Sequence, residues 1–157
     1  MVQYNGSRGR GACVPNLGSR NCVRLKRSVL TCAVLAQVTL LRSLFADYPN
    51  IDFTDKIGVL TPYKSQLREL QRQYQRSLTK DQQLCVESNT VDAFQGREKD
   101  IVIFTCVRAG AQRGIGFVAD TRRMNVALTR AKQAIWVVGN ARALGRNSDW
   151  RSYIRCA

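Results

Sequence analysis

The segment 120–132 contains two arginines whose spacing suits phosphate chemistry. On a helix of 3.6 residues per turn, Arg123 and Arg130 lie two turns apart, so their guanidinium groups face the same way. A guanidinium group is planar, permanently charged and well matched to phosphate oxygens. The segment is therefore typical either of an arginine finger on a rigid helix or of a basic amphipathic helix with solvated arginines. The apolar stripe of this helix would consist of Met124, Leu128 and Ala131.

Strands alternate with helices before and after this segment. A short apolar run predicts a buried parallel strand at Ile57–Thr61. Further strands are predicted at Val86–Val91, Ile101–Val107 and Ala134–Gly139. Apolar residues at helical spacing predict helices over 34–45, over Tyr63–Ser77 and around Trp150. Such alternation predicts an α/β domain with a mostly parallel sheet and right-handed crossovers.

Polar segments follow several of these strands. In open parallel sheets, ligands bind beyond the carboxyl ends of the strands. Three segments are expected to occupy such positions: Thr61-Pro62-Tyr63, the turn Gln95–Glu98 and the loop 108–118. The helix after Tyr63 also has a basic outer face, which either lines a nucleic-acid path or is simply solvated. Its cations are Lys64, Arg68, Arg72 and Arg76.

Three runs resemble motifs IV, V and VI of superfamily-1 helicases, in the order and at separations typical of that family. They are Ile57–Gln66, Asn89–Asp100 and Gly116–Lys132. They resemble the branch that contains senataxin and the nonsense-mediated-decay helicase, and Arg122–Asn125 and Trp136 are closer to the senataxin-like subgroup. The resemblance implies that residues 32–157 form the second RecA-like domain of an ATP-dependent RNA/DNA helicase. Its sheet would be of the P-loop NTPase type, and the helicase core would be incomplete.

The resemblance also implies roles for the two arginines. Arg130 corresponds to the motif VI arginine that reaches the γ-phosphate of ATP, where a fixed cation would stabilise charge in the transition state. Arg123 either contacts the nucleotide or braces Asp92 or Asp120, since structural ion pairs are common near such sites.

Two further sets of residues take their expected roles from the resemblance. Glu98 matches the motif V acid that contacts the ribose, Gly96 lets the backbone approach closely, and Arg97 lies beside the phosphates. The complete nucleotide-binding turn would be Gln95, Gly96, Arg97 and Glu98. Contacts to the nucleic-acid backbone, which position a strand without reading its sequence, would come from Thr61, Pro62, Tyr63, Thr90 and Val91.

The chain departs from the complete helicase pattern. It contains no G-x-x-x-x-G-K-[ST] loop and no Asp-Glu pair at a strand end, both of which belong to the first RecA-like domain in this family. ATP with Mg²⁺ is therefore expected to bind only when a first RecA-like domain is supplied in cis or in trans. The chain is interpreted as a truncated helicase, a fragment or a gene-model product that is inactive alone. The alternatives are a degenerate, non-catalytic nucleic-acid-binding module and a basic structural or ribosome-associated protein, which would explain the charge but not the motifs.

Composition limits the partners. The chain has 157 residues, 25 Lys and Arg against 11 Asp and Glu, and a formal net charge of +14. This excess favours a polyanion, with single-stranded RNA or DNA first and an anionic membrane surface second. Histidine is absent from the sequence, which excludes histidine-based acid–base catalysis and most zinc sites, and no metal site is predicted. The six cysteines lack C-x-x-C spacing and are expected to be free thiols, with Cys106 in the core.

The amino-terminal segment differs from the rest of the chain. Residues 1–31 are basic, contain no acid, and lack hydrophobic periodicity over most of their length, so disorder is predicted. The apolar stretch 29–41 is too short to span a bilayer, and no membrane partner is predicted. The predicted location is the nucleus, although Arg24–Arg27 alone is a poor nuclear signal. The cytoplasm is the alternative, and a mitochondrial transit peptide is a minor one.

Overall fold

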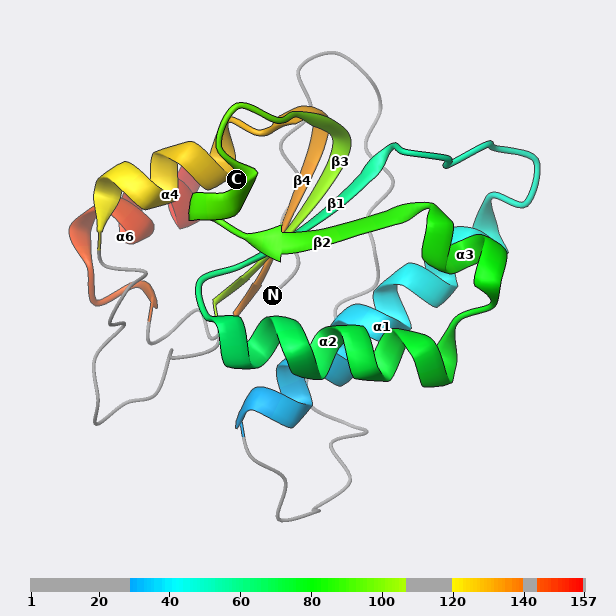
Figure 1. The fold of residues 1–157 in the computed structure, drawn as a ribbon. Coiled ribbons are helices and arrows are strands. Elements are labelled where there is room, and N and C mark those ends of the chain that lie inside the picture. Colours follow the sequence, from blue (N-terminus) through cyan, green and yellow to red (C-terminus); the bar gives the residue numbers. More distant parts are fainter. Residues whose placement is uncertain (1–28, 107–119, 140–143, 157) are drawn as a thin grey trace.

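A four-stranded parallel sheet forms the centre of the domain. The computed structural model describes residues 29–106, 120–139 and 144–156. The sheet order is β2-β1-β3-β4, with every neighbouring pair parallel (Figure 1). The strands are β1 (Ile57–Thr61), β2 (Val86–Thr90), β3 (Lys99–Cys106) and β4 (Ala131–Gly139). The helices are α1 (Val29–Asp47), α2 (Lys64–Ser77), α3 (Lys80–Leu84), the 3₁₀ helix η1 (Asp92–Phe94), α4 (Thr121–Leu128) and α6 (Ser148–Cys156).

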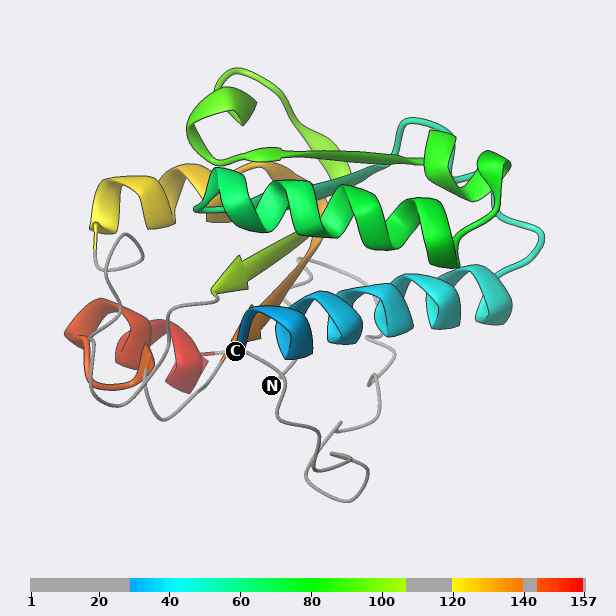
Figure 2. The same cartoon turned by 60° about the horizontal axis from the view of Figure 1, so that its bottom comes forward.

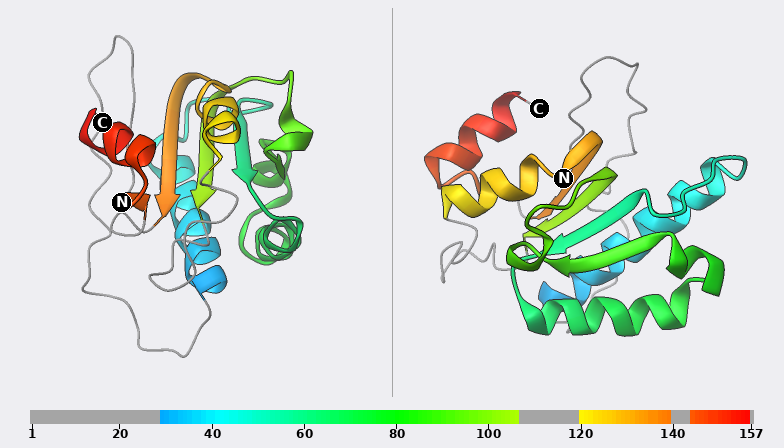
Figure 3. Two further views of the ribbon diagram at one scale, coloured as in Figure 1. Left: turned by 90° about the vertical axis from the view of Figure 1, so that its left-hand side faces the viewer. Right: turned by 45° about the horizontal axis from the view of Figure 1, so that its top comes forward.

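Both faces of the sheet are buried. On one face, Val59 and Ile103 pack in a cluster with residues of α1 and α2, which lie side by side (Figure 2). On the other face, Leu60 and Phe104 pack in a cluster with residues of η1, α4 and α6 (Figure 3). Burial on two faces explains why the central strand β1 and the middle of β3 are continuous apolar runs rather than alternating ones.

The predicted α/β class with a parallel sheet flanked by helices is confirmed. The prediction for β1 is also confirmed residue for residue, and Trp150 lies within a helix. The first helix begins at Val29, inside the segment predicted as disordered, and residues 1–28 lie outside the described part of the chain, as does the loop 108–118. No helix in the described part combines the length and apolarity needed to cross a membrane.

Three strand boundaries differ from the prediction. β2 ends at Thr90, so Val91 follows the strand and does not belong to it. β3 begins at Lys99, and β4 begins at Ala131, each earlier than predicted. The early starts of β3 and β4 result from long-range pairing. Lys99 and Ala131 are partners in the β3–β4 register, and the Lys99 N–H donates to the Arg130 carbonyl at 3.0 Å. Pairing between distant segments extends the sheet beyond its apolar residues.

The arginine helix is shorter than predicted. α4 ends at Leu128, where Thr129 closes it by donating its hydroxyl to the Asn125 carbonyl at 2.8 Å. Arg130 lies in the turn that follows, and Ala131 lies in β4. The buried residues of α4 are Met124 and Ala127. The predicted stripe of Met124, Leu128 and Ala131 is therefore wrong, because pairing of Ala131 with β3 ends the helix.

Candidate functional site

The predicted site residues lie at opposite ends of the strands, one set at the carboxyl ends and the other at the amino ends. Thr61 and Thr90 lie at the carboxyl ends of β1 and β2, where they are register partners. The turn Gln95–Glu98 immediately precedes β3, and Arg130 immediately precedes β4, so both lie at amino ends. The expectation that the Gln95–Glu98 turn lies at a carboxyl end is wrong. Because β2 and β3 are parallel, the short connection 91–98 must return along the sheet before β3 can begin.

The turn before β3 has the geometry of a type II β-turn. The Arg97 N–H donates to the Phe94 carbonyl at 3.1 Å, Gln95 has φ −60° and ψ 133°, and Gly96 has φ 80°. That second central position requires a positive φ, which glycine adopts without steric cost. A side chain at Gly96 would have no atom within 4 Å, so backbone conformation rather than crowding requires glycine here.

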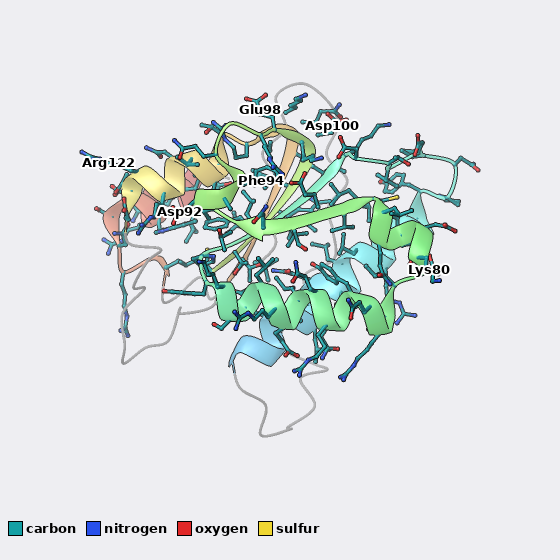
Figure 4. The ribbon with its side chains drawn as sticks, viewed as in Figure 1. Lys80, Asp92, Phe94, Glu98, Asp100 and Arg122 are labelled. Carbon is teal, nitrogen blue, oxygen red and sulfur yellow. The ribbon has the colours of Figure 1, made fainter. Side chains whose placement is uncertain are left out.

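The turn displays its polar groups to solvent. Gln95, Gly96, Arg97 and Glu98 are all exposed. Figure 4 shows Glu98 at the outer end of the turn and Phe94 turned inward toward the sheet. Phe94 is fully buried and anchors η1 over β1. Gly58 permits this approach, because a Cβ there would lie 3.1 Å from Phe94 Cζ. A buried anchor thus presents an exposed, polar turn.

Arg130 lies against this turn. Its Nη1 donates to the Arg97 carbonyl at 3.5 Å, its Nε to the Val126 carbonyl at 3.1 Å, and its Nη2 to Thr129 Oγ1 at 3.3 Å. A cation at the carboxyl end of a helix is favoured by the helix dipole. The side chain is half-buried. The structure therefore brings Arg130 together with the Gln95–Glu98 turn.

Arg123 points elsewhere. Its Nε donates to Asp92 Oδ1 at 3.2 Å, and its Nη1 lies 3.7 Å from Asp120 Oδ2. Asp120 also caps α4, accepting from the Arg122 N–H at 3.0 Å. The predicted bracing of Asp92 and Asp120 is therefore present. The prediction that Arg123 and Arg130 face the same way from one helix is wrong, because Arg130 lies beyond the helix end.

A charge network that the sequence did not reveal fastens the turn to the sheet. The Glu87 carboxylate of β2 accepts from Arg97 Nη1 and, at 3.0 Å, from Lys99 Nζ. Lys99 also pairs with Asp55, whose φ is 57°. Lys99 is 7% exposed, so this cation is held almost inside the protein. No sequence signal marked Glu87, which lies among polar residues on an edge strand.

The carboxylates keep this buried lysine charged. Burial lowers the pKa of Lys99, but hydrogen bonds to Asp55 and Glu87 outweigh that effect and raise the pKa above its ordinary value. Burial likewise raises the pKa of Glu87, but hydrogen bonds from Lys99 and Arg97 more than offset it and lower the pKa. Both groups are therefore ionised at neutral pH, and the network is a true ion-pair cluster.

The residues predicted to contact nucleic acid, at the carboxyl ends of β1 and β2, are more deeply buried than that role suggested. Thr61 is 0% exposed and donates its hydroxyl to Gln66 Oε1. Thr90 is 8% exposed, and its Oγ1 accepts from the Ala93 N–H at 3.3 Å. Val91 is buried, and its N–H donates to the Thr61 carbonyl at 3.2 Å. Pro62 is buried too, whereas Tyr63 is half-buried at the start of α2. Tyr63 is therefore the most accessible side chain of the predicted set.

Comparison with known proteins identifies relatives of this fold. A family model described as an AAA domain matches residues 25–142. Helicase sen1 of Schizosaccharomyces pombe is 43% identical over 117 residues, which make up 74% of this chain and 7% of that protein. Helicase SEN1 of Saccharomyces cerevisiae is 43% identical over 122 residues, or 76% of this chain and 6% of that protein. ATP-dependent helicase NAM7 of the same yeast is 51% identical over 98 residues, or 61% of this chain and 10% of that protein.

The matched segment spans only a small part of each of these relatives, 6–10% of their length. The family model nevertheless covers well over half of this chain, and the matched residues include the β-strands, the Gln95–Glu98 turn and Arg130. The parallel sheet flanked by helices is the fold expected of such a domain. The chain belongs to the AAA-domain family of superfamily-1 helicases related to Sen1 and NAM7.

Proposed function

We propose that this domain acts as the second RecA-like half of an ATP-dependent RNA/DNA helicase, with Arg130 as its arginine finger. The observation that carries the proposal is the contact between the Arg130 guanidinium and the exposed Gln95–Glu98 turn. That contact, to the Arg97 carbonyl, places a permanent cation against the turn that carries the exposed Glu98, within a surface formed by two chain segments. The arrangement suits a nucleotide, which has one end that is anionic and another that offers hydroxyl donors.

Each side chain of this surface has a chemical role in the proposal. Glu98 makes no hydrogen bond or ion pair within the described residues, so its carboxylate is available to accept from a ribose hydroxyl. The bond from Arg130 Nη1 to the Arg97 carbonyl is long, at 3.5 Å, so little is lost when Nη1 turns toward a phosphate oxygen. Magnesium and the phosphate cradle would come from the first RecA-like domain, because this sequence has no G-x-x-x-x-G-K-[ST] loop and no Asp-Glu pair at a strand end.

The nucleic acid would lie at the carboxyl ends of β1 and β2. Thr61 and Thr90 end adjacent strands there, and Tyr63 begins α2. Because Thr61 and Thr90 are buried, they would stabilise these strand ends rather than contact the nucleic acid. Tyr63 and backbone groups would lie nearest the nucleic-acid strand. Nucleotide and nucleic acid would thus bind at opposite ends of the same strands. A rigid sheet would then carry any movement caused by phosphate contact at Arg130 directly to the strand-binding edge.

Reconstitution tests the proposed function. The chain alone is expected to release no phosphate from ATP, with or without single-stranded RNA, because positioning of phosphate and magnesium supplies most of the catalysis in phosphoryl transfer. Fusing the first RecA-like domain of Helicase SEN1 ahead of this chain should restore RNA-stimulated phosphate release. This fusion is called the two-domain assembly below. Steady turnover by the isolated chain would contradict the assignment of a second half.

The main alternative is a degenerate module that binds nucleic acid without turnover. It predicts that the two-domain assembly binds RNA but remains inactive after fusion. A two-domain assembly that folds, binds single-stranded RNA and still releases no phosphate would therefore favour the degenerate module. The nuclear and cytoplasmic locations both remain predictions under either function.

Binding of single-stranded nucleic acid by the chain is expected to be weak, indifferent to sequence and strongly dependent on salt. Contacts to a phosphate backbone release counterions, so log affinity falls with log salt by about 0.7 for each phosphate neutralised on a single strand. Fluorescence anisotropy with labelled oligouridine at several salt concentrations measures this slope. Tyr63→Ala should weaken binding and Leu84→Ala, at a 77% exposed position away from that edge, should not. Equal binding to heparin, with no effect of Tyr63→Ala, would indicate only non-specific attraction.

A further inference from the structure

Glu87 holds both neighbours of Glu98. One oxygen of its carboxylate accepts from Arg97 Nη1, and the other accepts from Lys99 Nζ at 3.0 Å. Arg97 and Lys99 flank Glu98 in the chain, so a single acid on β2 fastens the residues on both sides of it. Glu98 itself has no partner within the described residues. The exposed acid is thus held between two tethered cations.

The ion pair between Glu87 and Lys99 spans the strand that lies between them. Glu87 lies on β2, Lys99 begins β3, and β1 runs between them. Gly58, the register partner of Glu87 on β1, gives the Lys99 side chain room to pass, because a Cβ at Gly58 would lie 3.1 Å from Lys99 Cγ. The same gap receives the ring of Phe94. Residues of β1, β2 and β3 therefore all contribute to fixing the Gln95–Glu98 turn.

This arrangement also differs from an ordinary surface ion pair. Exposed pairs contribute little, because solvent screens them and because two flexible side chains must be ordered. Here Lys99 is 7% exposed and the side chain of Glu87 is 27% exposed, whereas the side chain of Arg97 is 58% exposed, so the Lys99 pair is the less screened of the two. An ion-pair network that is partly buried and shares one carboxylate is less screened and geometrically more specific.

We propose that Glu87 is a positioning residue for nucleotide binding, which sets the place of Glu98 by gripping Arg97 and Lys99. This inference rests on the proposed function, in which Glu98 contacts the ribose. Glu87 does not touch the nucleotide. It acts by keeping the Gln95–Glu98 turn in the conformation in which Glu98 is exposed and the Arg97 carbonyl accepts from Arg130. The Lys99 N–H bond to the Arg130 carbonyl belongs to the β3–β4 pairing and does not depend on Glu87.

The test compares Glu87→Gln with Glu69→Gln. Glutamine at position 87 keeps the size of the side chain but removes the charge that holds both cations. Glu69 is the matched control, because it also pairs with an arginine, Arg72, but on α2. In the chain alone, Glu87→Gln should speed hydrogen exchange of the Arg97 amide, which donates to the Phe94 carbonyl, about tenfold, roughly the effect of one lost hydrogen bond to a charged group. Glu69→Gln should leave that amide unchanged.

The second measurement uses the two-domain assembly. Glu87→Gln should raise KM for ATP about tenfold and change kcat less than about threefold, because the backbone that carries Arg130 is unaffected. Glu87→Asp, which keeps the charge, should recover part of the affinity. Unchanged amide exchange would overturn the inference, and so would faster exchange with an unchanged KM. The Arg130→Ala variant separates the two proposals: loss of turnover there with no effect of Glu87→Gln leaves the finger intact and rejects only the role of Glu87.

Discussion

Replacing Arg130 by alanine in the two-domain assembly is expected to lower RNA-stimulated ATP turnover by roughly 10³–10⁵, the usual worth of an arginine finger. That factor corresponds to about 4–7 kcal/mol of transition-state stabilisation. Affinity for single-stranded RNA should barely change, because the predicted strand-binding residues lie at the other edge of the sheet. Steady-state phosphate release and fluorescence anisotropy measure the two quantities on the same preparation.

The control must separate chemistry from folding. Arg130 also donates to the Val126 carbonyl at the end of α4, so its loss should cost the fold up to about 1.5 kcal/mol. Arg130→Lys should restore part of that stability but little turnover, because a point charge cannot reproduce the planar guanidinium fork. Arg122→Ala, an exposed position on the same helix, should affect neither. Near-parental turnover by Arg130→Ala, or a loss fully explained by unfolding, would make the residue a structural helix cap.

The buried strands could be predicted from the sequence because local composition determines them. β1 is apolar from Ile57 to Leu60 and buried along its whole length, and its predicted and observed boundaries coincide. The end of α4 could not be predicted in this way. Thr129, Arg130 and Ala131 are compatible with a helix, and the helix ends because Ala131 pairs with Lys99 across the sheet. Contacts between residues far apart in the sequence therefore decided the position of Arg130.

The candidate site was predictable to a similar extent. The motif resemblance marked the Gln95–Glu98 turn and Arg130, which lie in contact. It did not mark Glu87, whose neighbours on the edge strand β2 are polar and half-buried. Its role depends on Lys99 crossing β1 at Gly58, which is a property of strand order. The parallel direction of the strands explains why the two predicted sets of residues separate, because one set ends strands and the other precedes them.

Trp150 joins the last helix to the face of the sheet on which α4 packs. It is 1% exposed, and its ring stacks on Phe104 of β3 with centroids 6.1 Å apart and an interplanar angle of 23°. Tyr153 meets it edge to face at 5.9 Å. Asn147 Oδ1 caps the helix by accepting from the Trp150 N–H at 3.1 Å. Met124 and Ala127 of α4 belong to the same cluster.

Trp150→Ala is accordingly expected to lower the free energy of unfolding by about 3–5 kcal/mol, through lost burial and the cavity left among these residues. This is a large fraction of the roughly 5–15 kcal/mol that stabilises a typical domain. Chemical denaturation followed by circular dichroism measures the change. Trp150→Phe should cost less, because a ring remains to stack on Phe104, and Leu84→Ala, at a 77% exposed position, should stay within about 0.5 kcal/mol. A Trp150→Ala effect as small as that of Leu84→Ala would mean that α6 does not help to hold α4, and with it Arg130, on the sheet.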